Sequence, residues 1–190
     1  MFVLLGWGVR SWPRRASVPA GERGPQVTEA VGGPLWVVAA GSKEPLMVGR
    51  VLSPQDRLVL ENGRLQVVWP DGTIARLEGP TAWQLEDAQQ STLQDGRLLV
   101  WLPPTSPPVP STKRWQFPGG TAVVAPGGAF FVAVARDRTV RLAQLEGETL
   151  VFRPNQGDRP VLRLGSSSQL TVRADGQWEP PTVLVPGRSR

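Results

Sequence analysis

Few residues of this 190-residue chain could carry out catalysis, because it contains neither histidine nor cysteine. The serines Ser166-Ser167-Ser168 could act as nucleophiles only beside a base, and histidine is the usual one. A serine–lysine pair could draw only on Lys43 and Lys113, and neither stands in a recognisable motif. We therefore interpret the three serines as a polar turn.

The carboxylates show no catalytic pattern either. Glycoside hydrolysis requires two opposed carboxylates, and no spacing indicates that Asp56, Asp71, Glu78 or the pair Glu86-Asp87 would oppose one another. A metal site would depend on oxygen ligands alone, as calcium sites do, and no acid-rich loop of the required spacing occurs in the sequence. We predict that the chain is not an enzyme and has no metal or cofactor.

Two glycine pairs could suggest a phosphate-binding loop. No Lys-Ser/Thr follows Gly119-Gly120 or Gly127-Gly128, and both pairs lie between expected strands rather than before a helix. We interpret them as turn glycines, and we do not expect a small-molecule substrate.

The eight tryptophans are the remaining residues with a role to assign. Large aromatic side chains usually fill the core of a β-sheet protein, and we expect most of them there. Trp101 and Trp115 flank the segment 103–110 (PPTSPPVP), which is too rich in proline for a strand or a helix. We expect these two tryptophans to be exposed, where they could bind a protein or stack on sugar rings.

The net charge of +5 raises the question of nucleic-acid binding. Residues 27–186 carry 15 basic and 15 acidic side chains, so the excess positive charge lies in the terminal segments. Binding to phosphates requires clustered cations. We therefore do not expect a nucleic-acid partner.

The chain starts with an apolar run, residues 1–9 (MFVLLGWGV), which is followed by a basic stretch. Nine residues cannot span a bilayer, which takes about 20. Residues 1–15 could be the end of a longer signal or transmembrane segment, an interfacial anchor with Trp7 and Trp12 at the lipid headgroups, or a terminus without function. We expect export across a bacterial membrane or attachment to it.

The rest of the chain consists of short apolar runs separated by turn residues. In residues 64–69 the apolar Leu65, Val67 and Trp69 alternate with the polar Arg64 and Gln66, which indicates a half-buried strand. Asn62-Gly63 and Asp71-Gly72 are typical of tight hairpin turns, and Asp95-Gly96 is a further turn signal before residues 97–102 (RLLVWL). That last run is apolar on both faces, which predicts a strand covered on both sides.

These patterns predict an all-β protein, a β-solenoid or sandwich-like single domain of many short strands. The 21 glycines and 20 prolines disfavour long helices, and no stretch shows a helical period. We expect this domain at residues 27–178. It would follow an apolar and basic segment with a linker at 1–26 and precede a proline-rich basic tail at 179–190.

A series of different short motifs follows a characteristic order along residues 27–178. They are Gly49, Leu52, Asp56 and Leu58; Asp71-Gly72-Thr73-Ile74 with Leu77; Leu93, Gly96, Leu98 and Val100; Phe117 with Val123-Val124-Ala125-Pro126; Gly128-Ala129-Phe130; Val140, Leu142, Leu145, Gly147 and Val151; and Leu162, Leu164 and Gly165. This ordered series resembles the FecR domain, a β-rich module of bacterial envelope proteins. The sequence reads Gly128-Ala129 where the family pattern has Gly-Thr.

The resemblance implies an extracytoplasmic module that docks on other proteins and has no catalytic activity. The regulators of this family carry an N-terminal cytoplasmic segment that binds a sigma factor, and the residues before 27 are too few to hold it. We therefore expect no direct sigma-factor regulation. We expect a protein partner in the bacterial periplasm or cell envelope, in a signalling or assembly system, with residues 1–15 as a candidate membrane anchor.

The candidate interaction surface comprises Trp101, Trp115, Pro104, Pro107 and Phe130. A many-stranded fold that is not a closed barrel also leaves edge strands, which can accept a strand from a partner. The alternative function is that of a carbohydrate-binding module, which would display a row of exposed tryptophans beside polar side chains.

Overall fold

The structure is a computed structural model that describes residues 24–39, 41–104, 113–154 and 159–184. These residues form strands and no helix, which confirms the predicted all-β class. The described strands join in one sheet of fifteen strands that does not close on itself. They are β1 (Gln26–Val31), β2 (Leu35–Ala39), β3 (Ser42–Pro45), β4 (Arg57–Leu60), β5 (Arg64–Val68), β6 (Ile74–Leu85), β7 (Gln90–Trp101), β8 (Arg114–Phe117), β9 (Gly120–Val124), β10 (Ala129–Val134), β11 (Val140–Glu146), β12 (Glu148–Phe152), β13 (Leu162–Gly165), β14 (Ser168–Val172) and β15 (Thr182–Val183).

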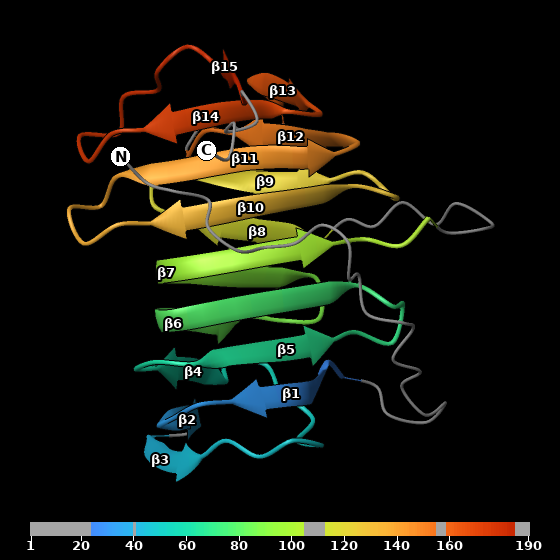
Figure 1. The fold of residues 1–190 in the computed structure, drawn as a ribbon, viewed down its shortest axis with the longest axis vertical. Helices are drawn as coiled ribbons and strands as arrows, with labels where there is room; N and C mark the ends of the chain where they lie inside the picture. The colour runs from blue at the N-terminus through green and yellow to red at the C-terminus, as the bar shows by residue number, and fades with distance from the viewer. Residues whose placement is uncertain (1–23, 40, 105–112, 155–158, 185–190) are drawn as a thin grey trace, which may run out of the picture.

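The sheet folds into two layers because its two longest strands, β6 and β7, each belong to both (Figure 1). In β6, residues 74–78 pair with β5 and residues 81–84 pair with β4. In β7, residues 90–92 pair with β8 and residues 96–101 pair with β10. The front layer runs β1-β5-β6-β7-β10-β11-β14-β15, and the back layer runs β3-β2-β4-β6-β7-β8-β9-β12-β13. The result is the sandwich-like form of the predicted fold.

Glycine allows β6 and β7 to bend from one layer into the other. The register of the β6–β7 pair shifts between Glu78 and Ala82. Opposite this shift, Gly96 has a φ of +93°, and a Cβ there would overlap the Thr81 hydroxyl and the Pro80 carbonyl. Only glycine fits such a position without strain. Asp95-Gly96 therefore lies inside β7, and the turn predicted there is wrong.

The other turn residues divide into two groups. Asp71-Gly72 joins the paired strands β5 and β6, as the hairpin pattern predicts. Asn62-Gly63 instead connects β4 of the back layer to β5 of the front layer, and these two strands do not pair. The hairpin predicted around Asn62-Gly63 is therefore wrong, because this turn carries the chain between the layers.

The strands extend slightly beyond the predicted domain of residues 27–178. The first strand begins at Gln26, and β15 pairs with β14 through Gln169 and Thr182. Part of the segment predicted as a tail thus contributes a strand to the front layer.

The hydrophobic core lies between the two layers and receives alternate residues of each strand. Leu65, Val67 and Trp69 all point into it, in agreement with the alternation in the sequence. In the run 97–102, Leu98 and Val100 belong to the core, while Leu99 is buried on the opposite face of the sheet.

Candidate functional site

The described residues around the proline-rich loop come together at one end of the two layers. We call this site the loop base and define it as Trp101, Pro103, Pro104 and Lys113 with the turns Asp71-Gly72 and Pro126-Gly127. In Figure 1, β7 ends on the right-hand side of the molecule, next to the turns that follow β5 and β9. The chain between Pro104 and Lys113 lies outside the described residues.

The entry to the loop is held by the backbone and by close packing. The Leu102 N–H donates to the Gly128 carbonyl at 2.9 Å, and the Gly127 N–H donates to the Leu102 carbonyl at 3.0 Å. These bonds extend the β7–β10 pairing by one residue. Pro103 packs against Gly72, where an added Cβ would lie 3.3 Å from Pro103 Cγ. The loop therefore leaves the sheet in a defined direction.

The exit from the loop is held by an ion pair. The Lys113 ammonium lies against the Asp71 carboxylate, and the lysine side chain is almost completely buried. Asp71 also accepts a hydrogen bond from the Thr73 N–H at 3.0 Å. Burial alone would raise the pKa of Asp71, but the bonds from Lys113 and Thr73 and the lysine charge outweigh burial and hold the pKa below its ordinary value.

A row of aromatic rings lies beneath the loop base. The rings of Trp69 and Trp115 meet edge-to-face with centroids 5.4 Å apart. Trp69 also meets Trp83, and Trp115 meets Phe130, each with centroids 6.2 Å apart. Edge-to-face pairs of this kind stabilise a core beyond the area that they bury. The four rings thus give the loop base a rigid support that joins the front and back layers.

The structure divides the five predicted interaction residues into three groups. Trp101 is half-buried on the outer face of the front layer, and Pro104 is exposed. Trp115 and Phe130 are 2% and 0% exposed, so the expectation that they lie at the surface is wrong. Their strands turn them into the core, where they support the loop base from below. Pro107 lies outside the described residues.

The role of Asp71 and Lys113 does not follow from the sequence. There, Asp71 is one scattered acid among several, and Lys113 is one of two lysines that could pair with a catalytic serine. Two features of the sequence could have drawn attention to these residues: Asp71 belongs to an Asp-Gly turn, and Lys113 is a single lysine at the end of a proline-rich segment. Nothing in the sequence indicated that the two would meet, since 42 positions separate them.

The described tryptophans do not form an exposed row. Trp69, Trp83 and Trp115 are buried in the core. Of the half-buried ones, Trp36 in β2 contacts Lys43 Nζ at 4.5 Å, and Trp178 after β14 donates to the Gly119 carbonyl at 3.2 Å. Two strands lie between β2 and β7, and two lie between β14 and β7, so neither tryptophan neighbours Trp101. No observation in the described part of the chain therefore favours sugar stacking.

The edge strands differ in what they offer to a partner's strand. The outer edge of β1 is occupied by its own chain, because the Gly49 N–H donates to the Val27 carbonyl at 2.8 Å. β3 carries Lys43 and Pro45, residue types that oppose strand addition, and β15 has two residues. β13 (Leu162–Gly165) has four residues and carries the exposed Arg163, a charge that likewise opposes strand addition.

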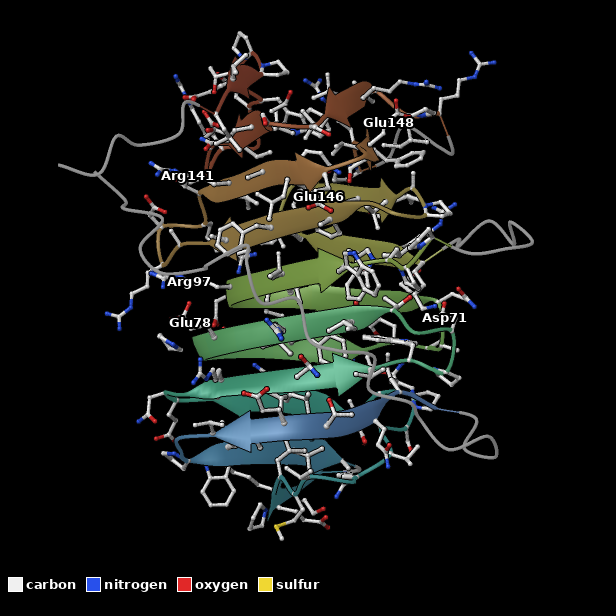
Figure 2. The ribbon with its side chains drawn as sticks, turned by 45° about the vertical axis from the view of Figure 1, so that its right-hand side comes forward. Asp71, Glu78, Arg97, Arg141, Glu146 and Glu148 are labelled. Atoms are coloured by element: carbon white, nitrogen blue, oxygen red, sulfur yellow. The ribbon has the colours of Figure 1, made fainter. Side chains whose placement is uncertain are left out.

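The charged side chains of the front layer form a row of alternating sign. Arg64 lies opposite Glu78 in the sheet, and Glu78 lies opposite Arg97, with 3.2 Å between Glu78 Oε2 and Arg97 Nη1. Figure 2 shows Glu78 and Arg97 together at one end of the strands, with Arg141 beyond them and Asp71 at the opposite end. Exposed pairs of this kind contribute little stability, and we interpret the row as a solvated face.

The acids that were considered for catalysis have structural contacts. The Asp56 carboxylate is buried and accepts from the Ser53 N–H at 3.0 Å, and Glu86 accepts from the Thr92 hydroxyl at 2.9 Å. Among the described residues, no group of three or more His, Cys, Asp or Glu side chains could hold a metal ion. The same residues contain no helix with the length and apolar character needed to cross a membrane.

The comparisons with known proteins identify structures of similar fold. No family model matches the sequence, and none of the curated proteins matches it. Two crystal structures of a protein from Parabacteroides distasonis, assigned as an anti-sigma factor, match with TM-scores of 0.50 and sequence identities of 20% and 19%. Each match covers 66% of this chain and 57% of the other, so the similarity spans little more than half of the solved protein. What the comparisons show is that about two thirds of this chain shares its fold with part of that protein.

Proposed function

We propose that the chain is a non-catalytic interaction module of the FecR type that binds a protein partner in signalling or assembly at the bacterial cell envelope. The fold shared with an anti-sigma factor structure supports a regulatory role. The ordered FecR-like motifs of the sequence support the same role independently.

The loop base is the observation that carries this proposal. It holds the proline-rich loop at both ends, through the Leu102 backbone bonds on one side and the Lys113–Asp71 pair on the other. Residues that are already fixed in the free protein lose little conformational entropy when a partner binds, and the described residues on either side of the loop are fixed in this way. Beside the loop, Pro104 is exposed and Trp101 is half-buried, and tryptophan is a residue type that interfaces use as an anchor.

Location at the periplasm or envelope and association with a membrane through residues 1–15 are further parts of this proposal. They are supported by the apolar start of the sequence and by the envelope location that the FecR resemblance implies. Fractionation of host cells would test them, and recovery of the full-length protein in the cytosol alone would contradict them.

A photo-reactive amino acid at position 104 would test the interaction surface. We expect this variant, incubated with envelope extract, to capture a specific protein, and the same label at the exposed position 163 on β13 not to capture it. With the captured partner purified, Trp101→Ala should weaken binding by about 30-fold, because truncating a central tryptophan costs about 2 kcal/mol. The matched control is Trp36→Ala, which truncates another half-buried tryptophan far from the loop base.

Three results would contradict the proposal. Equal weakening by Trp36→Ala and Trp101→Ala would show that the loop base is not the binding surface. Retention of a polysaccharide on a glycan array, without any protein and with loss in Trp101→Ala, would support the carbohydrate-binding alternative. Turnover in a hydrolase substrate panel that disappears in Asp56→Asn or Glu86→Gln would identify an enzyme.

A further inference from the structure

Three turns of the chain share one backbone geometry. In each of them the N–H of the first residue donates to the carbonyl of the fifth, and the N–H of the fourth donates to the carbonyl of the first. An aspartate at the third position accepts from the N–H of the fifth. These turns span residues 69–73, 135–139 and 173–177. The fourth position has a positive φ in all three, and it is Gly72 in the first turn, Arg138 in the second and Gly176 in the third.

Arg138 is held in a backbone conformation that disfavours a side chain. Its φ of +68° lies in the left-handed region, where the Cβ of an L-residue is crowded by the backbone. Hairpin loops of three residues with this geometry accordingly favour glycine at this position. The two matching turns form with Gly72 and Gly176, so the hydrogen bonds of the turn do not require an arginine. Strained positions of this kind cluster at functional sites, which directs attention to the guanidinium of Arg138.

The loop between β10 and β11, which we call the basic tip, consists of Arg136, Asp137 and Arg138. Both arginines are exposed, and neither forms an ion pair with a described residue. The Asp137 carboxylate between them directs Oδ1 back to the Thr139 N–H at 2.9 Å. Other arginines of the surface do form ion pairs, namely Arg64, Arg97, Arg163 and Arg173. The basic tip therefore offers two guanidinium groups to a partner.

The basic tip lies at the end of the molecule opposite to the loop base. In Figure 1, β10 points to the left and the chain turns there into β11, whereas β7 ends on the right at the loop base. Figure 2 shows Arg97 and Arg141 at one end of the strands and Asp71 at the other. Ala133 lies between Arg97 and Arg141 in the sheet, one residue before the last β10–β11 pair. Two further arginines thus lie beside the tip on the front layer.

We propose that the basic tip is a second interaction surface, which binds an acidic segment of a protein partner through Arg136 and Arg138. A guanidinium group matches a carboxylate with two parallel hydrogen bonds, and two such groups on one turn fit a short segment that carries several carboxylates. The surface is separate from the loop base, so the inference does not rest on the function proposed above. A chain with a surface at each end can bind two partners at once.

The number of arginines favours a peptide over larger polyanions. An anionic membrane surface is recognised by clusters of about four to eight basic residues, and nucleic acid by an extended set of phosphate contacts. The tip has two unpaired arginines, and Arg97 beside it is already paired with Glu78 at 3.2 Å. Short acidic segments are therefore the class of partner that matches the tip.

Binding of a fluorescein-labelled oligoglutamate peptide to the full-length chain tests this surface. Fluorescence anisotropy at low salt should give a dissociation constant that rises about 10-fold in Arg136→Gln combined with Arg138→Gln, because two exposed ion pairs are lost. The matched control is Arg57→Gln combined with Arg159→Gln, which removes the same charge from two exposed arginines outside the tip. The control should change the dissociation constant by less than about 3-fold, since only the uniform charge of the protein changes.

Arg138→Gly separates binding from folding, because the two properties should change in opposite directions. The variant should weaken binding of the peptide about 3-fold. It should also lower the equilibrium constant of unfolding about 2- to 5-fold, because glycine relieves the strain at positive φ and recovers more than its own loss of backbone entropy. Urea unfolding measures this second change. An arginine that served only the fold would lose stability together with binding.

Four outcomes would overturn the inference. The first is that the wild type does not bind the peptide, and the second is that the tip and control variants weaken binding equally, which would show that binding follows net charge. The third is a loss of stability in Arg138→Gly. The fourth is that vesicles of phosphatidylglycerol and phosphatidylcholine, and not the peptide, depend on Arg136 and Arg138, which would assign the tip to a membrane surface. Trp101→Ala should leave binding of the peptide unchanged, so a failure here and a failure at the loop base are distinguishable.

Discussion

Lys113 and Asp71 form an ion pair, and the tryptophans two residues from each of them form a second contact between the same two segments of the chain. Trp115 follows Lys113, Trp69 precedes Asp71, and the two tryptophan rings meet edge-to-face at 5.4 Å. The exit of the proline-rich loop is therefore joined to the β5–β6 turn by two contacts, the partly buried ion pair and the apolar ring contact. Each of these contacts can be tested separately.

Asp71→Asn should lower the free energy of unfolding by about 1–2 kcal/mol, because the buried Lys113 loses its carboxylate partner. The estimate is modest because Asp71 itself is partly exposed. Chemical denaturation would measure the change. The matched control is Asp175→Asn, since Asp175 accepts a turn hydrogen bond from the Gln177 N–H at 2.9 Å in an exposed Asp-Gly turn. Equal losses in the two variants would contradict a special role for the lysine pair.

The same pair predicts a dependence of stability on pH. The pKa of Asp71 is lower in the folded chain than its ordinary value. Its stabilising contribution is therefore complete above about pH 4 and is lost as the pH falls through the folded value. Denaturation between about pH 5 and pH 2 should show a steeper loss of stability in the wild type than in Asp71→Asn. Parallel curves for the two proteins would refute this linkage.

Trp115→Ala should lower the free energy of unfolding by about 3–5 kcal/mol, because it removes a ring that contacts both Trp69 and Phe130. Trp115→Phe should cost less than about 2 kcal/mol. The indole N–H of Trp115 has no hydrogen-bond partner among the described residues, so phenylalanine gives up ring area and no hydrogen bond. Thermal or urea unfolding would measure both variants. A loss of unfolding free energy in Trp115→Phe as large as that in Trp115→Ala would indicate that the indole N–H makes a hydrogen bond.

Gly96→Ala should destabilise the fold by about 3 kcal/mol or more, since it adds a Cβ at positive φ against the Thr81 hydroxyl and the Pro80 carbonyl. Gly176 has a similar φ of +82° with nothing within 4 Å of an added Cβ. Gly176→Ala should therefore cost about 1–2 kcal/mol from backbone strain alone. Urea unfolding gives the free energy of unfolding of each variant. The difference between the two variants measures the cost of the steric overlap at the bend in β6 and β7. Equal costs would contradict this account of the bend.

Arg97→Ala should change the free energy of unfolding by less than about 1 kcal/mol, because the Glu78–Arg97 pair is largely exposed. The small effect should shrink further in concentrated salt, which screens surface charges. Urea unfolding at low and high salt would test this. A loss that is large and independent of salt would mean that Arg97 packs as part of a covered surface.

The class of the fold could be predicted from the sequence because it depends on local properties. The alternation of Leu65, Val67 and Trp69 with polar residues reports which face of a strand is buried, and that period is a property of the strand itself. The Asp71-Gly72 turn was also correct as a hairpin. The same local rule applied to residues 114–117 (RWQF) would have turned Trp115 into the core. The error came from judging Trp115 by its distance in sequence from the proline-rich segment.

The pairing of the strands was decided by the tertiary structure. Asn62-Gly63 and Asp71-Gly72 both supply the positive φ of a tight turn, but turn chemistry does not determine which strand the next one pairs with. One turn closes a hairpin and the other carries the chain between layers. Similarly, Gly96 reads as a turn residue in isolation, and its role in the bend of β7 depends on Thr81 and Pro80 of the neighbouring strand.

The loop base shows the same division. The proline-rich segment that interrupts the strands and the apolar residues on both faces of the run 97–102 can be recognised in the sequence alone. The contact between Asp71 and Lys113 depends on the tertiary fold, as does the placement of Trp115 and Phe130 beneath the site and of Trp101 on its outer face. The physical reason is that backbone conformation is set by neighbours in sequence, whereas ion pairs and ring contacts depend on which distant strands the two layers bring together.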